Sequence, residues 1–147
     1  MTDPRSAYRQ AAAQGASPVQ LVIRLYEQII EDLRQAINAI QQSQVELRTN
    51  KVNHALLVIA HLQSRLNFEA GGKPARDLNH FYNVLRYNLM QAQLSASKEI
   101  LAQQITDLLE VRAAWLEVDR AGNRAGPVEA AAATAASSAP RHAGQRG

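Results

Sequence analysis

The residues best suited to metal or acid–base chemistry are two histidines, His54 and His61. Their spacing of seven residues places both imidazoles on one face of a helix. A di-iron site in a helical bundle also needs inward-facing glutamates and Glu-x-x-His pairs. The chain contains no Glu-x-x-His, and residues 55–60 include no acidic side chain. We therefore predict surface or edge histidines and no metal site.

Other kinds of reactive site lack their partners in the sequence. Gly71-Gly72 followed by Lys73 has neither the preceding strand nor the full glycine spacing of a phosphate loop, so we interpret the two glycines as a helix end. No serine stands in a paired histidine motif. The absence of cysteine removes a thiolate nucleophile and a disulfide framework. We expect a protein that is not an enzyme and needs no cofactor.

The composition is typical of one ordinary domain. The chain has 147 residues, of which 46% are apolar, and this is enough to build one hydrophobic core. A chain without cysteine fits a reducing compartment. No apolar stretch follows the first five residues, and the longest apolar run, 55–60, is far too short to span a bilayer. We expect a cytoplasmic protein with no signal peptide and no stable membrane insertion.

The basic residues are not concentrated as nucleic-acid binding requires. The formal net charge is +3, and the segment from residue 121 onward, with three arginines and one glutamate, accounts for all but one of these charges. Elsewhere the basic side chains are scattered among acidic ones, as at Arg24, Glu27, Glu31 and Arg34. Nucleic-acid binders usually gather Lys and Arg on one face. We interpret these residues as solvated helix faces and expect no nucleic-acid partner.

A helix start is visible at Ser17-Pro18. Ser17 can cap the first turn, Pro18 suits the first helical position, and Gln20 can complete a capping box. The apolar pattern that follows predicts a helix from about Ser17 to about Gln44. Residues 1–16 then form a flexible N-terminal arm.

Three more helices follow from apolar residues that alternate spacings of three and four. The second comes after the polar Arg48-Thr49-Asn50 and is expected to end at Gly71-Gly72. The third runs from about Pro74 to about Ser95, and the fourth is capped by Ser95 or Ser97 and ends near Arg120. The seam residues of the four helices are Ile23, Tyr26, Ile30, Leu33, Ile37 and Ile40; Val52, Ala55, Ile59, Leu62 and Leu66; Leu78, Phe81, Leu85, Leu89 and Ala92; Leu101, Ile105, Leu108, Val111, Trp115 and Val118.

The predicted fold is all-α, an antiparallel up-down four-helix bundle over residues 17–120. Short connections make consecutive helices antiparallel neighbours, and no strand-like alternation competes with the four helical patterns. From residue 121 to 147 the chain is mainly Ala, Ser, Gly and Arg. Such a segment cannot bury enough apolar area to offset its conformational entropy. We predict a disordered Ala-rich tail there.

Each helix also carries a second apolar set beside its seam. The set comprises Val22, Leu25, Ile29 and Ala36; Leu56 and Leu57; Tyr82, Val84 and Tyr87; Ile100, Leu109 and Leu116. One explanation is a compact bundle that buries three or four residues per two turns of every helix. The other is an exposed apolar groove, which on a soluble protein marks a binding site for an amphipathic helix.

Several short motifs, taken in order, resemble the FliS family of flagellin-specific export chaperones. They are Ala7-Tyr8, Ala16-Ser17-Pro18, Leu25-Tyr26, Gly71-Gly72, Phe81-Tyr82, Leu108-Leu109 and Ala114-Trp115. The resemblance covers residues 7 to 118, which is nearly all of the predicted folded body. The ordered set is more specific than any one of its motifs.

The resemblance implies a cytoplasmic chaperone that binds the disordered C-terminal region of flagellin. It would prevent premature polymerisation and keep flagellin competent for flagellar type III secretion, with the export gate as a further partner. Tyr8 then belongs to an arm that shields the flagellin groove, and an isolated solvated Tyr is the alternative. The predicted groove residues are Val22, Leu25, Ile29, Tyr82 and Leu109, while Tyr26 and Trp115 are assigned to the core.

Two other functions remain open at this point. A helical adaptor or regulator would use the same groove for another amphipathic helix, so only the identity of the partner separates it from a flagellin chaperone. A nucleic-acid binder would need an Arg cluster on one helix face and a steep salt dependence of affinity. The sequence contains no such cluster.

Overall fold

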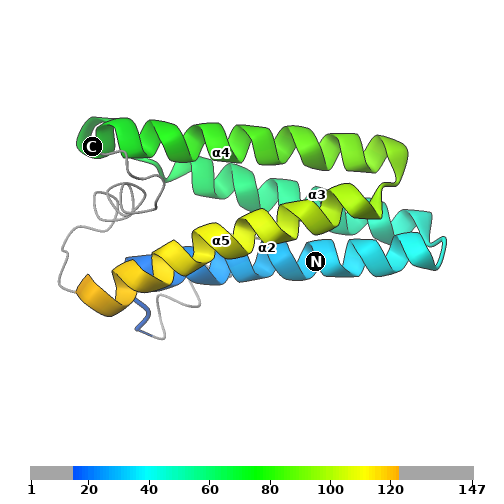
Figure 1. The fold of residues 1–147 in the computed structure, drawn as a ribbon, viewed down its shortest axis with the longest axis horizontal. Coiled ribbons are helices and arrows are strands. Elements are labelled where there is room, and N and C mark those ends of the chain that lie inside the picture. The colour runs from blue at the N-terminus through cyan, green and yellow to red at the C-terminus, as the bar shows by residue number, and fades with distance from the viewer. Residues whose placement is uncertain (1–14, 123–147) are drawn as a thin grey trace.

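The computed structural model describes residues 15–122 as four helices, with no strand in that range (Figure 1). They are α2 (Pro18–Gln41), α3 (Val45–Ser64), α4 (Phe68–Ser95) and α5 (Lys98–Gly122). The predicted all-α class is confirmed. Most of the predicted arm, 1–16, and of the predicted tail, 121–147, lies outside the described residues, so those two assignments stay predictions.

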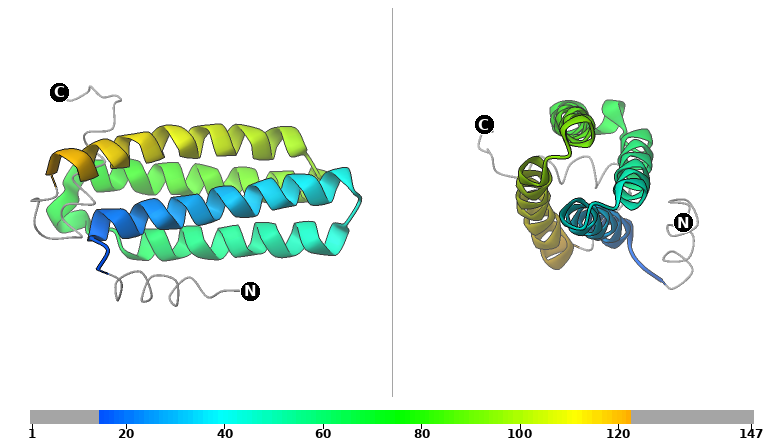
Figure 2. Two further views of the ribbon diagram at one scale, coloured as in Figure 1. Left: turned by 90° about the horizontal axis from the view of Figure 1, so that it is seen from below. Right: turned by 90° about the vertical axis from the view of Figure 1, so that its right-hand side faces the viewer.

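The helices are arranged as an antiparallel up-down bundle. α2 packs against α3 and α5, and α4 packs against the same two helices from the opposite side. Seen end on, the four helices surround a common centre (Figure 2). α2 makes more extensive contacts with its two neighbours than α4 does. None of the described helices is both long enough and apolar enough to cross a membrane.

The start of α2 has the cap that the sequence predicts. The Ser17 hydroxyl accepts a hydrogen bond from the Gln20 amide N–H at 3.1 Å, and the Gln20 side-chain oxygen accepts one from the Ser17 N–H at 3.0 Å. Pro18 occupies the first helical position. This capping box satisfies two backbone donors that the helix start would otherwise leave unpaired.

The boundaries of α3 differ from the prediction at both ends. The helix begins at Val45, so the polar residues 48–50 lie inside it, because exposed polar side chains do not interrupt a helix. It ends at Ser64, well before Gly71-Gly72. Asn67 then caps a new turn by accepting a hydrogen bond from the Ala70 N–H at 2.9 Å. The expectation that the two glycines end the second helix was therefore wrong.

Gly72 instead makes a break near the start of α4. Its φ of 55° and ψ of −132° are not helical, and Pro74 follows two residues later. The regular part of α4 then runs to Ser95, as predicted. Ala96 adopts a left-handed conformation after it, and Ser97 caps α5 by accepting a hydrogen bond from the Ile100 N–H at 3.1 Å.

One hydrophobic core runs along the centre of the bundle. All four helices contribute to it, and Leu33, Ile59, Leu85 and Leu108 are among its fully buried members. Within each helix the core residues recur mostly at spacings of three and four, as the predicted seams require. Because the seam of each helix faces this core, the opposite face of the helix lies on the surface of the bundle. A partner can bind there.

The conformation of Gly72 predicts a specific sensitivity to substitution. A Cβ added at Gly72 would meet no atom within 4 Å, but the positive φ is strained for any L residue. We expect Gly72→Ala to lower the free energy of unfolding by about 1–2 kcal/mol in urea denaturation. Gly122→Ala is the matched control, since Gly122 is also uncrowded and has no positive φ. Equal effects of the two substitutions would contradict this explanation.

Candidate partner-binding surface

Three aromatic side chains join α2, α4 and α5 in the core. The hydroxyls of Tyr26 and Tyr82 lie 2.8 Å apart in a hydrogen bond. The ring of Tyr26 stands edge-on to Tyr82 and to Trp115, with centroid distances of 6.2 and 6.5 Å. All three are buried, which confirms the core assignment of Tyr26 and Trp115.

Burial also determines the chemical state of the two tyrosines. Desolvation raises the pKa of Tyr26 and of Tyr82 above the ordinary value, because a phenolate loses its hydration in the core. Both hydroxyls are therefore protonated at neutral pH. Their hydrogen bond therefore connects two neutral groups and helps to hold α2 and α4 together.

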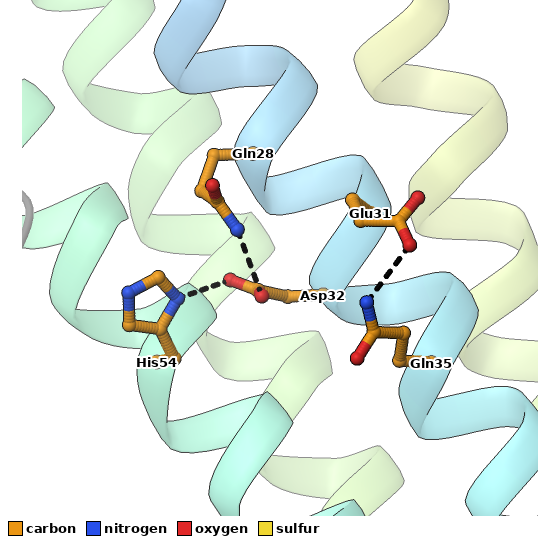
Figure 3. Close-up of polar contacts among 5 residues, drawn as sticks. All are labelled: Gln28, Glu31, Asp32, Gln35 and His54. Carbon is orange, nitrogen blue, oxygen red and sulfur yellow. Dashed lines mark hydrogen bonds and ion pairs between the residues drawn. The ribbon is translucent and has the colours of Figure 1, made fainter. Parts of the chain in front are cut away.

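A second buried polar contact joins α2 to α3 (Figure 3). Asp32 accepts hydrogen bonds from His54 Nδ1 at 2.5 Å and from Gln28 Nε2 at 3.1 Å. Asp32 and His54 are both almost completely buried. The expectation that His54 is a surface or edge histidine was therefore wrong. The cause is a carboxylate on the preceding helix, which lets the imidazole enter the bundle with a hydrogen-bond partner.

The charge on Asp32 is disfavoured by its surroundings. Burial raises the pKa of the Asp32 carboxyl, and the hydrogen bonds from His54 and Gln28 act in the opposite direction without cancelling this effect. The pair is a histidine and a carboxylate without a third ligand. In the described part of the chain no group of three or more potential ligands could hold a metal ion.

The predicted groove residues fall into different environments. Leu25, Ile29 and Tyr82 are buried members of the core, and Val22 is partly buried against it. Leu109 stands on the surface of α5 with 41% of its area exposed. Tyr8 lies outside the described residues. The bundle thus brings four of these side chains together by packing and leaves one of them open to solvent.

Some of the apolar residues that reach the surface share one face of a helix. Leu109 and Leu116, seven residues apart, lie on one face of α5, and we call them the α5 ridge. Val84, Tyr87 and Leu94 lie on the outer face of α4, and we call them the α4 stripe. Leu94 and Tyr87 are the most exposed of these, at 82% and 60%.

An ion pair between two helices crosses the α5 ridge. Arg112 lies between Leu109 and Leu116 on the same helix face, and its Nε donates to Glu27 Oε2 of α2 at 2.9 Å. Gln20 and Asp119 make a second link between these helices, at 3.5 Å. The α5 ridge is therefore an apolar surface that one interhelical ion pair interrupts. An amphipathic helix can pack on a surface of this kind.

The sequence contains a pattern that indicates a buried partner for Asp32. Leu25, Ile29, Asp32 and Ala36 follow spacings of four, three and four, so Asp32 occupies a position in the second apolar set of its helix. A carboxylate at such a position needs a buried partner. That the partner is His54 follows only from the packing of α3 on α2.

The direction of the Asp32 pKa shift predicts how stability changes with pH. Because the folded state binds this proton more tightly than the unfolded state, the stabilisation is complete below the ordinary carboxyl pKa of about 3.9 and is lost as the pH rises through the folded pKa. We expect the free energy of unfolding, measured relative to Asp32→Asn, to fall from about pH 4 toward neutrality. Asp77→Asn, at an exposed carboxylate of α4, is the control. A relative stability that rises with pH would contradict the assignment.

The tyrosine pair predicts a non-additive mutant cycle. Tyr82→Phe leaves the buried Tyr26 hydroxyl without one of its hydrogen bonds, which should lower the free energy of unfolding by about 1–2 kcal/mol. The double variant with Tyr26→Phe removes both hydroxyls and should cost less than the sum of the two single changes. Urea denaturation of the four proteins measures the difference. Additive effects would show that the hydroxyls do not interact.

Comparison with known proteins places the chain in a family. Over residues 1–122 it matches the family described as flagellar protein FliS. It is 30% identical over 103 residues to the flagellar secretion chaperone FliS of Vibrio cholerae, which covers 70% of this chain and 76% of that protein. It is 28% identical over 106 residues to the flagellar secretion chaperone FliSB of Pseudomonas aeruginosa, covering 72% and 84%.

A third relative agrees with these two. The chain is 29% identical over 113 residues to the flagellar secretion chaperone FliS of Campylobacter jejuni, covering 77% of this chain and 88% of that protein. The family match spans all four described helices and includes every motif on which the resemblance rests. This match shows that the chain belongs to the FliS family of flagellar proteins.

Proposed function

We propose that this protein is a cytoplasmic export chaperone for flagellin. It binds the disordered C-terminal region of the flagellin chain, prevents premature polymerisation, and keeps the subunit competent for flagellar type III secretion. The observation that carries the proposal is the FliS family match over residues 1–122. The relatives from three bacteria are named as flagellar secretion chaperones, which supports the same role for this chain.

The bundle offers the kind of surface that this role needs. A disordered segment with amphipathic helical stretches can bury its apolar side on the ridge of a helical protein. Ordering the segment costs free energy, so the net affinity is lower than the buried area alone suggests, and release at the export gate stays possible. Neither binding nor release needs ATP or another cofactor in this proposal, because both depend only on the contact between the two surfaces and its moderate net affinity.

Within this proposal the predicted groove residues have two roles. Leu109, together with Leu116, contacts flagellin directly from the α5 ridge. The more buried Val22, Leu25, Ile29 and Tyr82 form the floor that holds the surrounding helices in position. Tyr8 in the N-terminal arm covers the same surface when flagellin is absent, so a chain lacking residues 1–15 should bind flagellin more tightly than the full chain.

Calorimetric titration with a peptide from the C-terminal region of the same organism's flagellin tests the function. One-to-one binding with a negative heat-capacity change and little salt dependence supports a chaperone that buries apolar surface. Binding of unrelated amphipathic helices but not of this peptide favours the adaptor alternative. An affinity for nucleic acid that falls steeply with salt would favour a nucleic-acid-binding protein.

The α5 ridge predicts which substitution weakens binding. Leu109→Asp places a charge where an apolar contact is proposed, and we expect about tenfold weaker flagellin binding. Leu57→Asp is the matched control, because Leu57 is also an exposed leucine but lies on α3. Circular dichroism checks that both variants remain folded. Leu25→Asp is unsuitable because Leu25 is buried in the core, and an equal loss in both variants would move the site away from the ridge.

A further inference from the structure

The α5 ridge is an exposed apolar surface close to the end of the described chain. Leu109 and Leu116 expose 41% and 38% of their area, and Ala113 between them is also exposed. Among the described helices α5 packs only against α2 and α4, so no helix of this set covers the ridge. The chain continues beyond Gly122 as residues 123–147, from the end of the same helix that carries the ridge. The segment closest to the ridge along the chain is therefore this tail.

The sequence of the tail contains the start and stop signals of a helix. Pro127 suits a first helical position, and Glu129 follows in the first turn, where a negative charge is favourable. Residues 130–136 are almost all alanine, which has the highest helix propensity, and Pro140 prevents continuation. A helix over residues 127–139 would be about 20 Å long, which is enough to span the whole α5 ridge.

Such a helix has one apolar face, which we call the tail seam. Thr134 and Ser137 lie on the opposite side of the helix. Alone, the segment buries too little apolar area to offset its conformational entropy, and for this reason the sequence predicts a disordered tail. The α5 ridge supplies the apolar surface that the segment lacks. The tail seam has spacings of four, three and four and consists of Val128, Ala132, Ala135 and Ala139.

The connection and the charges favour a tail helix that runs back along α5. Residues 123–126 form a connection of the length that joins the two antiparallel helices of an αα-hairpin. Because both helices rise equally per residue, Ala135 then lies level with Ala113. The tail carries three arginines and one glutamate, whereas α5 carries three basic and five acidic side chains, so net charges of +2 and −2 attract each other. We propose that the tail seam packs on the α5 ridge and covers it.

A weak contact is enough for this arrangement, because the tail is joined to the helix that it covers. A short connection gives an effective concentration in the millimolar range. If flagellin binds the α5 ridge, as the proposed function has it, flagellin must displace the tail, and its apparent affinity falls with the fraction of chains whose ridge is free. The arm with Tyr8 precedes α2, which the Arg112–Glu27 ion pair joins to α5, so arm and tail approach the ridge from different sides.

Disulfide cross-linking tests the packing, and the chain has no cysteine of its own to interfere. Two full-length variants combine Ala113→Cys with either Ala135→Cys or Thr134→Cys. The chain between the two thiols is almost equally long in both, but Ala135 lies in the tail seam and Thr134 on the opposite side. Under mild oxidation the intramolecular disulfide should form at least about tenfold faster in the Ala135 variant. Equal rates, or a faster reaction of the Thr134 variant, overturn the proposal.

Titration with the flagellin peptide tests the competition. In the full-length chain Ala132→Glu places a charge in the tail seam, and it should bind the peptide about fivefold more tightly than the wild type, because the ridge is free more often. Ala130→Glu is the matched control on the opposite side of the same helix and should leave the affinity unchanged. Equal affinities of the two variants would show that the tail does not compete with flagellin. Absence of peptide binding in every chain contradicts the proposed function, whereas the cross-linking rates do not depend on flagellin.

Discussion

The burial of α2 is the constraint on which the rest of the structure depends. This helix places apolar side chains on its seam and on the face beside it, and both faces are covered by α3, α5 and the core residues of α4. Hydrophobic burial supplies the driving force but is not directional. The position of each neighbour along α2 therefore depends on the polar atoms that α2 also buries.

Two buried polar contacts supply that direction. Asp32 accepts one hydrogen bond from Gln28 of its own helix and a second from His54, and the second bond relates α3 to α2. Tyr26 relates α4 and α5 to α2 through its hydrogen bond to Tyr82 and its edge-on contact with the ring of Trp115. An unsatisfied buried polar group costs about 1–3 kcal/mol, so a bundle with shifted helices loses stability at both places. Both contacts lie in the core and hold in place the helices whose outer faces form the surface.

Some apolar side chains of the described helices are exposed and lie outside the core. The α5 ridge combines Leu109 and Leu116 with the Arg112–Glu27 ion pair, and it is the surface on which we propose that flagellin binds. The α4 stripe lies on a different helix of the bundle.

The sequence by itself determined much of the local structure of this protein, but not the two ends of α3. The Ser17 and Gln20 cap, the Pro74 to Ser95 helix and the seam spacings follow from interactions within a few residues, and so does the all-α class. Only the tertiary structure decided that His54 is buried, that Leu25, Ile29 and Tyr82 lie in the core, and that Leu109 stays exposed. Helical periodicity identifies the face on which a residue lies. How far a neighbouring helix covers that face depends on contacts between residues distant in the chain, such as Asp32 with His54 and Tyr26 with Tyr82.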